Sequence, residues 1–202
     1  MSAITAIVLA AGEGKRMGFP KALLPIEGGY LIEHLARRLC LLKCNEIVCV
    51  VNSEIKHKLP EKFGSEAKVL VNMELEKGQL YSIQLGLDAI ESRPKAILLL
   101  PVDFPFISNS TLETLIDRAN PDKILIPTFY DETSMQMRRG HPPAWGSNLK
   151  QLLFKASLDL GARDIYRKHL ELIEELQTED SGVLFNVNNP QDWEKGLRQY
   201  YE

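Results

Sequence analysis

Continuous apolar runs in the first part of the chain have the length of buried β-strands. The first covers residues 4–10 (ITAIVLA), and such runs are typical of strands that are covered on both faces. Similar runs follow at residues 47–51, 68–71, 96–100 and 123–126. The pattern predicts a strand at each of these positions.

Segments with helical spacing separate these strands. Leucines between residues 31 and 42 recur at the intervals of one helix face, and residues 80–90 and 110–119 also predict helices. Alternating strands and helices require crossover connections, which produce a mostly parallel sheet with helices on both faces. We therefore expect an α/β fold of the Rossmann-like type.

The pattern becomes less regular after Pro127. Residues 128–146 indicate a loop or an antiparallel excursion from the sheet. Helices are then predicted near 149–154 and 163–169, strands at 172–177 and 183–187, and a last helix over 190–200 with proline in its first turn. We interpret residues 1–202 as a single domain whose C-terminal third adds a lid or a substrate-facing layer.

The balance of charged residues and the lengths of the apolar runs argue against a nucleic-acid-binding protein and against a membrane-spanning protein. The sequence has 24 Lys and Arg residues against 27 Asp and Glu residues, a formal net charge of -3. A general nucleic-acid-binding surface needs a basic excess, so we expect no nucleic-acid partner. No apolar run approaches the roughly 18 residues of a membrane span. The apolar N-terminus also lacks a basic leader, so we expect a cytoplasmic protein with no membrane partner.

The cysteines do not have the spacing of a metal-binding motif. Cys40 and Cys44 stand on a predicted helix, and Cys49 lies in the strand that follows. Neither a CxxC pair nor a matching histidine spacing is present. We therefore expect these residues to be small buried hydrophobic side chains rather than a metal or redox cluster.

A glycine-rich segment, residues 9–21 (LAAGEGKRMGFPK), follows the first predicted strand. Open α/β sheets bind ligands at the carboxyl ends of their strands. Glycines let backbone N–H groups approach an anion closely, and nearby cations supply charge, so the segment suits a polyphosphate. It lacks the GK[ST] of a Walker P-loop, and its GxGxxxG spacing differs from the dinucleotide fingerprint. The glycines and cations are Gly12, Gly14, Gly18, Lys15, Arg16 and Lys21.

Asp103 is a candidate metal ligand. It lies just beyond the strand predicted over residues 96–100, between Pro101 and Pro105. The carboxyl end of a central strand places this acid beside the glycine-rich segment. A hard oxygen ligand there can hold Mg²⁺ against phosphates. A helix-capping or turn aspartate is the structural alternative.

The glycine-rich segment resembles the signature of the MobA-like nucleotidyltransferases, in particular that of the molybdenum cofactor cytidylyltransferase (MocA-type) branch. The matching residues are Leu9, Ala10, Ala11, Gly12, Gly14, Arg16, Met17, Gly18, Pro20 and Lys21. The resemblance implies that the segment, Lys15 included, wraps the triphosphate of an NTP. Arg16 would contact the β and γ phosphates and Lys21 the α phosphate. The guanylyltransferase branch typically has LAGG where this chain has LAAG, which favours CTP over GTP.

Further motifs match the same family in the same order. The resemblance implies that Gly78, Gln79 and Ser82 line the base and ribose pocket, although a glycine turn and a helix cap explain them equally well. It also makes Asp103 the principal metal ligand. Asn186 and Asn188 occupy positions where the closing motif of the cytidylyltransferase branch has acids. Their amide oxygens can ligate Mg²⁺ without contributing charge, and an asparagine-rich turn before a helix is the alternative.

The resemblance places Arg139, His141 and Arg163 on the second substrate. The Gly-His-Pro triplet at residues 140–142 follows an arginine, as in the MocA-type branch, and residues 159–163 resemble another motif of the family. Residues 1–126 would then form the NTP-binding half and residues 127–202 the second-substrate half. Without the resemblance, His141 would be taken as a surface or packing residue.

Together these motifs predict a Mg²⁺-dependent enzyme, active as a monomer, that transfers CMP from CTP to the phosphate of the molybdenum cofactor (molybdopterin) and releases pyrophosphate. Arg16, Lys21 and Asp103 would neutralise charge as pyrophosphate leaves. Molybdenum hydroxylases are the client proteins that the resemblance implies. The alternatives are transfer to a sugar phosphate or another small phosphate, guanylyl transfer to molybdopterin, and a non-catalytic cofactor carrier, which the two asparagines motivate.

Overall fold

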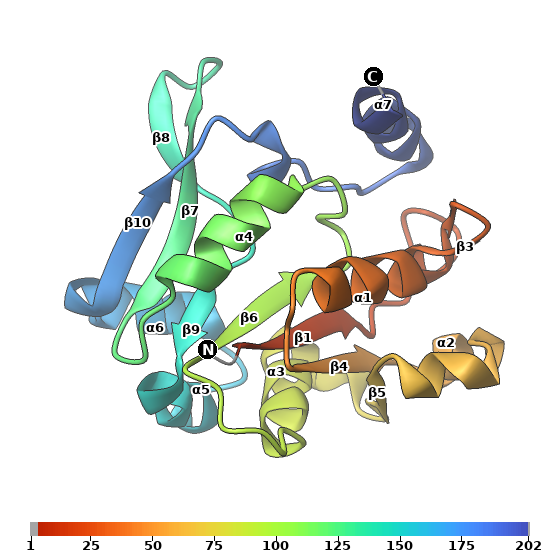
Figure 1. Cartoon of the computed structure of the whole chain (residues 1–202), viewed down its shortest axis with the longest axis horizontal. Coiled ribbons are helices and arrows are strands. Elements are labelled where there is room, and N and C mark those ends of the chain that lie inside the picture. The colour runs from red at the N-terminus through yellow and green to blue at the C-terminus, as the bar shows by residue number, and fades with distance from the viewer. Residues whose placement is uncertain (1–3, 202) are drawn as a thin grey trace.

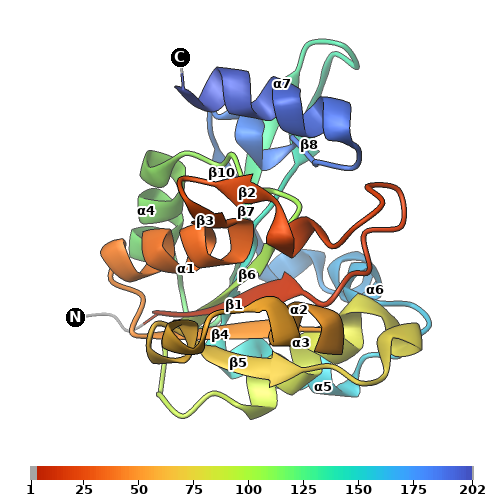
Figure 2. The same ribbon diagram turned by 90° about the vertical axis from the view of Figure 1, so that its right-hand side faces the viewer.

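A computed structural model describes residues 4–201 and shows one large sheet with helices packed on both faces (Figures 1 and 2). The strands of this sheet are β1 (Ile4–Ala10), β4 (Glu46–Val51), β5 (Lys68–Val71), β6 (Ala96–Pro101), β7 (Ile124–Asp131), β8 (Gln136–Arg139), β9 (Ala144–Gly146) and β10 (Ile173–Gln177). Two short strands, β2 (Pro25–Ile26) and β3 (Gly29–Tyr30), form a separate hairpin. Every strand predicted before residue 127 is present.

The large sheet is mostly parallel, as predicted. Its order is β10-β7-β9-β6-β1-β4-β5, and β8 pairs with the end of β7. β1 is parallel to both of its neighbours, β4 and β6, and β10 is parallel to β7. β9 runs antiparallel between β6 and β7. Residues 128–146 therefore form the antiparallel excursion that the irregular pattern allowed.

Successive side chains of β1 pack on opposite faces of the sheet, and helices cover both faces. Ala6 and Val8 belong to the core that includes residues of α1, α2, α4 and α7, whereas Ile7 and Leu9 belong to the core with α3, α5 and α6. A strand buried on both sides has no solvent-facing positions, which accounts for its continuous apolar run. The helices are α1 (Leu31–Leu41), α2 (Ser53–Lys58), α3 (Gly78–Asp88), α4 (Asn109–Arg118), α5 (Lys150–Lys155), α6 (Ala162–Lys168) and α7 (Pro190–Tyr201).

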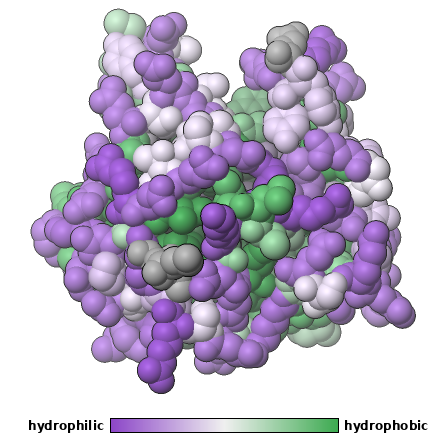
Figure 3. Space-filling view, viewed as in Figure 1, coloured by the Kyte–Doolittle hydropathy of each residue, from purple (hydrophilic) through white to green (hydrophobic). Residues whose placement is uncertain are grey.

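The surface seen in the direction of Figure 1 is mainly hydrophilic, and the hydrophobic residues that remain visible gather near its middle, where α1 and α4 lie (Figure 3). Among residues 4–201, no helix combines the length and the apolar character that crossing a membrane requires.

Three loops meet at one edge of the sheet because the strands before them run in the same direction. The glycine-rich segment follows β1, residues 72–77 follow β5, and Asp103 lies just after β6. The carboxyl ends of parallel strands are the usual ligand-binding edge of an open α/β sheet. The fold thus brings the sequence-predicted motifs to a common edge.

Residues 183–187 do not form the predicted strand. Residues Ser181–Val183 form a short 3-10 helix, and the side chain of Asp180 accepts a hydrogen bond from Gly182 N at 2.9 Å, which turns the chain. Val183 and Val187 are nevertheless buried in the core. Their backbone hydrogen bonds to other segments run from His141 N to Val183 O and from Val187 N to Asp103 O, and Val183 N donates within the turn to Asp180 O. The segment is apolar because it is buried, although it is not paired with a neighbouring strand. This burial explains the apolar pattern that resembled a strand.

The expectation of buried cysteines is wrong for Cys40, which is exposed near the end of α1. Cys44 is partly buried, and Cys49 is fully buried in β4. Burial raises the pKa of the Cys49 thiol to about 12, so this thiol remains protonated and unreactive at neutral pH.

Candidate active site

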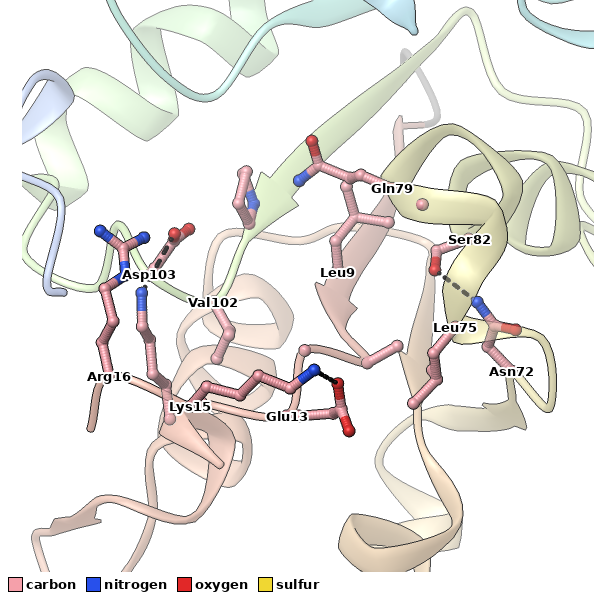
Figure 4. A pocket seen from close by; sticks show the side chains of 16 residues that line it. Leu9, Glu13, Lys15, Arg16, Asn72, Leu75, Gln79, Ser82, Val102 and Asp103 are labelled. Atoms are coloured by element: carbon pink, nitrogen blue, oxygen red, sulfur yellow. Dashed lines mark hydrogen bonds and ion pairs between the residues drawn. The ribbon is translucent and has the colours of Figure 1, made fainter. Parts of the chain in front are cut away.

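A cavity of about 410 Å³ opens at the carboxyl edge of β1 and β6 (Figure 4). This volume lies in the range of small-molecule sites. Ala10 does not line it, because its side chain packs in the core on the α1 face of the sheet. The other predicted NTP-binding residues do line it, and they are Leu9, Ala11, Gly12, Gly14, Lys15, Arg16, Lys21, Gly78, Gln79, Ser82 and Asp103.

A tight turn shapes the glycine-rich wall of the cavity. Met17 N donates a hydrogen bond to Gly14 O at 2.8 Å. Gly14 has a φ of +67°, and a Cβ at this position would lie 1.9 Å from Phe19 O. Both the left-handed conformation and the close approach to Phe19 therefore require glycine here.

We expect Gly14→Ala to weaken NTP binding about tenfold, because a strained non-glycine residue costs about 1–3 kcal/mol and the turn must open. Isothermal titration calorimetry with the nucleotide measures this change. Gly64→Ala is the control, since a Cβ at Gly64 meets no atom within 4 Å. Wild-type affinity in Gly14→Ala would contradict the assignment of this turn to the nucleotide.

The cations of the glycine-rich segment differ in their surroundings. Lys15 and Arg16 are exposed, and Lys15 Nζ pairs with Glu13 Oε2 at 2.9 Å (Figure 4). Arg16 has no ion-pair partner within the part of the chain that the structure describes. Lys21 begins the 3-10 helix Lys21–Leu23, and its side chain is only 15% exposed. Arg16 is thus available to an anion, while Lys21 is held in place.

Lys21 connects the predicted metal ligands. Its Nζ lies 3.4 Å from Asp103 Oδ2 and 3.3 Å from Asn188 Oδ1. A backbone hydrogen bond of 2.8 Å from Val187 N to Asp103 O fixes the two segments to each other. Asn186 Oδ1 is buried and accepts no hydrogen bond from the described residues. Residues far apart in the sequence thus converge on one positive charge.

The start of α3 forms another wall of the cavity. Gly78 has a φ of +76°, and Gln79 after it is exposed. Ser82 Oγ accepts a hydrogen bond from Asn72 Nδ2 at 2.9 Å, and both residues are buried (Figure 4). Asn72 also accepts a hydrogen bond from Glu74 N, so it orders the loop after β5.

Some lining residues were not predicted from the sequence, namely Glu13, Asn72, Leu75, Pro101 and Val102. A signal for Asn72 was present, because a polar residue directly follows a predicted strand at the ligand-binding edge. Leu75 begins the 3-10 helix Leu75–Lys77, which is too short for the sequence to show a periodicity that indicates which way a side chain faces.

One of the residues expected on the second substrate, His141, lies near the acid. The rings of His141 and Phe104 are 4.4 Å apart between centroids. Burial lowers the pKa of His141, the Asp103 carboxylate raises it, and the Arg163 guanidinium lowers it. His141 Nδ1 is buried and has no hydrogen-bond partner among residues 4–201. His141 therefore lies close enough to Asp103 and to Arg163 for both charges to act on its ring.

Arg139 lies elsewhere, on the exposed hairpin strand β8. Its Nε donates to Glu175 Oε1 of β10 at 2.8 Å. Arg139, His141, Arg163, Asn186 and Asn188 are all absent from the lining of the cavity. The structure thus brings Asn188 and His141 close to Asp103 and Arg163 close to His141, but leaves Arg139 paired with Glu175.

The chain is similar to a known protein family and to named relatives. The model of the MobA-like NTP transferase domain matches residues 6–173. The chain belongs to this family. A nicotine blue oxidoreductase of Paenarthrobacter nicotinovorans is 30% identical over 183 residues, which is 89% of each protein. A probable molybdenum cofactor guanylyltransferase of Rhodopirellula baltica is 28% identical over 197 residues, covering 92% of this chain and 88% of the relative.

The fold of this NTP transferase domain is also found in solved structures. A protein from Mycobacterium tuberculosis H37Rv, crystallised in complex with manganese, superposes with a TM-score of 0.74 at 20% identity. The match covers 98% of this chain and 99% of that one. The family confirms the expected resemblance and the nucleotidyltransferase class. Its members carry different named activities, so membership alone does not specify CTP.

Proposed function

We propose that this NTP transferase domain transfers CMP from CTP to the phosphate of a molybdopterin-type acceptor and releases pyrophosphate. The observation that carries nucleotidyl transfer is the convergence of Lys21, Asp103 and Asn188 beside the glycine-rich wall of the cavity. The preference for CTP is supported by the LAAG sequence at residues 9–12.

The oxygen donors beside Lys21 fit a divalent cation. Asp103 and Asn188 already share one ammonium group, and hard oxygen ligands suit Mg²⁺. Asn186 supplies a buried oxygen that has no partner among the described residues. In this proposal these residues hold Mg²⁺, which when bound neutralises charge on the phosphates. Within residues 4–201 there is no group of three or more His, Cys, Asp or Glu side chains that could hold a metal, and in this proposal phosphate oxygens of the bound nucleotide would complete the ligand set.

The remaining chemistry is positioning and charge neutralisation. Arg16, exposed and without an ion-pair partner in the described part of the chain, binds the β and γ phosphates, and Lys21 binds the α phosphate. The second pKa of a phosphate monoester is about 6, so the acceptor is already an anionic nucleophile at neutral pH. No general base is needed. These residues therefore act by orienting two anions and by balancing the charge of the leaving pyrophosphate.

The acceptor phosphate is proposed to lie near Arg163 and His141. Arg163 is exposed in the first turn of α6, and His141 presents a buried nitrogen that is unpaired within residues 4–201. Arg139 fits this role less well, because its guanidinium is engaged by Glu175. Residues 9–103 supply the whole lining of the cavity, which supports an NTP-binding function for the first half of the chain.

Guanylyl transfer is the second candidate, because the Rhodopirellula baltica relative is named a probable guanylyltransferase. Pyrophosphate release with molybdopterin and Mg²⁺, measured separately for CTP, GTP, ATP and UTP, tests both candidates. We expect the highest kcat/KM with CTP. A higher value with GTP would replace the first candidate by the second. Nucleotide binding without release from any NTP would instead support a non-catalytic cofactor carrier.

A further inference from the structure

We propose that Arg38 is a positioning residue that sets the orientation of Asp103 and Asn188. The proposal rests on the proposed function, because it assigns Arg38 a role in the same cation site. Arg38 lies on α1, outside the cavity and outside every motif that the sequence singled out.

The Arg38 guanidinium is buried and makes an unusual set of contacts. The residue is 7% exposed. Nη1 donates to Pro105 O at 2.9 Å, and Nη2 donates to Ile107 O. Asn109 Oδ1 accepts from Nε at 3.0 Å and from Nη2 at 2.8 Å. One side chain therefore holds residues 105–109, the segment that begins just after Asp103.

No carboxylate within residues 4–201 forms an ion pair with Arg38. Burial lowers the pKa of this guanidinium, and the charges of Tyr200, Asp180 and Glu27, which act without an ion pair, raise it. Burying a charge without a directly paired carboxylate is costly, so stability alone is a poor reason for an arginine here. The planar array of N–H donors, in contrast, matches several carbonyl oxygens at fixed angles, which lysine cannot do. The contacts thus point to a geometric role.

Residues 105–109 also contact elements other than α1. Asp180 Oδ2 accepts a hydrogen bond from Ser108 N at 2.8 Å. Phe106, in the middle of the segment, lies 5.3 Å from Trp193 and 6.0 Å from Phe185 between ring centroids. A Cβ on Gly196 of α7 would come within 2.0 Å of the Phe106 ring, so no larger residue fits there.

These contacts link Arg38 to the segments that carry the proposed metal ligands. Phe185 and Trp193 flank the residues that include Asn186 and Asn188, and Val187 N donates to Asp103 O. A shift of residues 105–109 would therefore move the Asp103 carboxylate and the Asn188 amide together. Groups that orient metal ligands from outside the coordination sphere change metal affinity by about 10–100-fold when they are mutated.

The test measures Mn²⁺ affinity of the full chain by electron paramagnetic resonance with CTP present, and CTP affinity by calorimetry with EDTA present. For Arg38→Met and Arg38→Lys we expect Mn²⁺ affinity to fall about tenfold or more, while CTP affinity without metal changes less than about twofold. Arg37→Met, an exposed neighbour on α1 with the same charge change, should leave both affinities unchanged.

Asn109→Ala provides a milder variant if replacement of Arg38 prevents folding, which circular dichroism would show. It removes one acceptor of Arg38 and should lower Mn²⁺ affinity in the same direction. Wild-type Mn²⁺ affinity in the folded variants, or an equal loss of CTP affinity without metal, would overturn the proposal alone. Absence of Mn²⁺ binding to the wild-type protein with CTP would overturn the proposed function and, with it, this inference.

Discussion

Lys21→Met should lower kcat/KM for nucleotidyl transfer by about 10²–10³-fold, because removing one preorganised donor to a developing charge has an effect of this size. The Lys21 ammonium is the cation nearest to the acid, at 3.4 Å from Asp103 Oδ2. Methionine keeps the length and the apolar stem of the side chain but removes the charge. Pyrophosphate release under steady-state conditions measures the loss.

The same variant should bind Mn²⁺ more tightly than the wild-type protein when no nucleotide is present. In the free protein, Lys21 occupies the oxygens of Asp103 and Asn188 and repels a second cation. Lys58→Met is the matched control, because Lys58 also has a carboxylate partner, Glu54 at 2.8 Å, but lies on α2 away from the cavity. Unchanged activity and unchanged Mn²⁺ affinity in Lys21→Met would remove Lys21 from the site.

Asp103→Asn should reduce kcat/KM by about 10²-fold or more and should shift the metal dependence to higher Mg²⁺ concentration. Asparagine is nearly isosteric, but it replaces the carboxylate of the proposed metal site by a third neutral amide. The backbone hydrogen bond from Val187 N to the residue-103 carbonyl can persist, so we expect the fold to be retained. Rates measured across a Mg²⁺ titration separate weaker metal binding from slower chemistry.

Asp122→Asn is the control for this charge change, since Asp122 is an exposed residue that accepts a hydrogen bond from Asn148 and does not line the cavity. It should have wild-type kinetics. If Asp103→Asn keeps full activity at low Mg²⁺ while Asp122→Asn behaves in the same way, Asp103 is a structural turn residue. That was the alternative interpretation of this acid.

Local sequence patterns are sufficient to predict the elements that depend on neighbouring residues alone. The apolar run of β1 and the glycine-rich segment after it were predicted because both depend on neighbours along the chain. The predicted strand over residues 183–187 was wrong because burial, not pairing, made that segment apolar. Asn72 was missed for a related reason. Its side chain donates to Ser82, ten residues further along the chain, and the spacing alone does not show that the start of α3 packs beside the loop after β5.

By itself, the sequence determined the α/β class, the strands of the parallel sheet and the segments that meet at its ligand-binding edge. Continuous apolar runs, helical spacing, glycines and turns are local signals, and the direction of parallel strands then places their ends together. Only the tertiary structure decided that Lys21 joins Asp103 to Asn188, that Arg139 pairs with Glu175 away from them, and that Arg38 holds the segment after the acid. Such contacts depend on how the helices pack against the sheet. The spacing of residues along the chain does not encode the distance between side chains that this packing brings together.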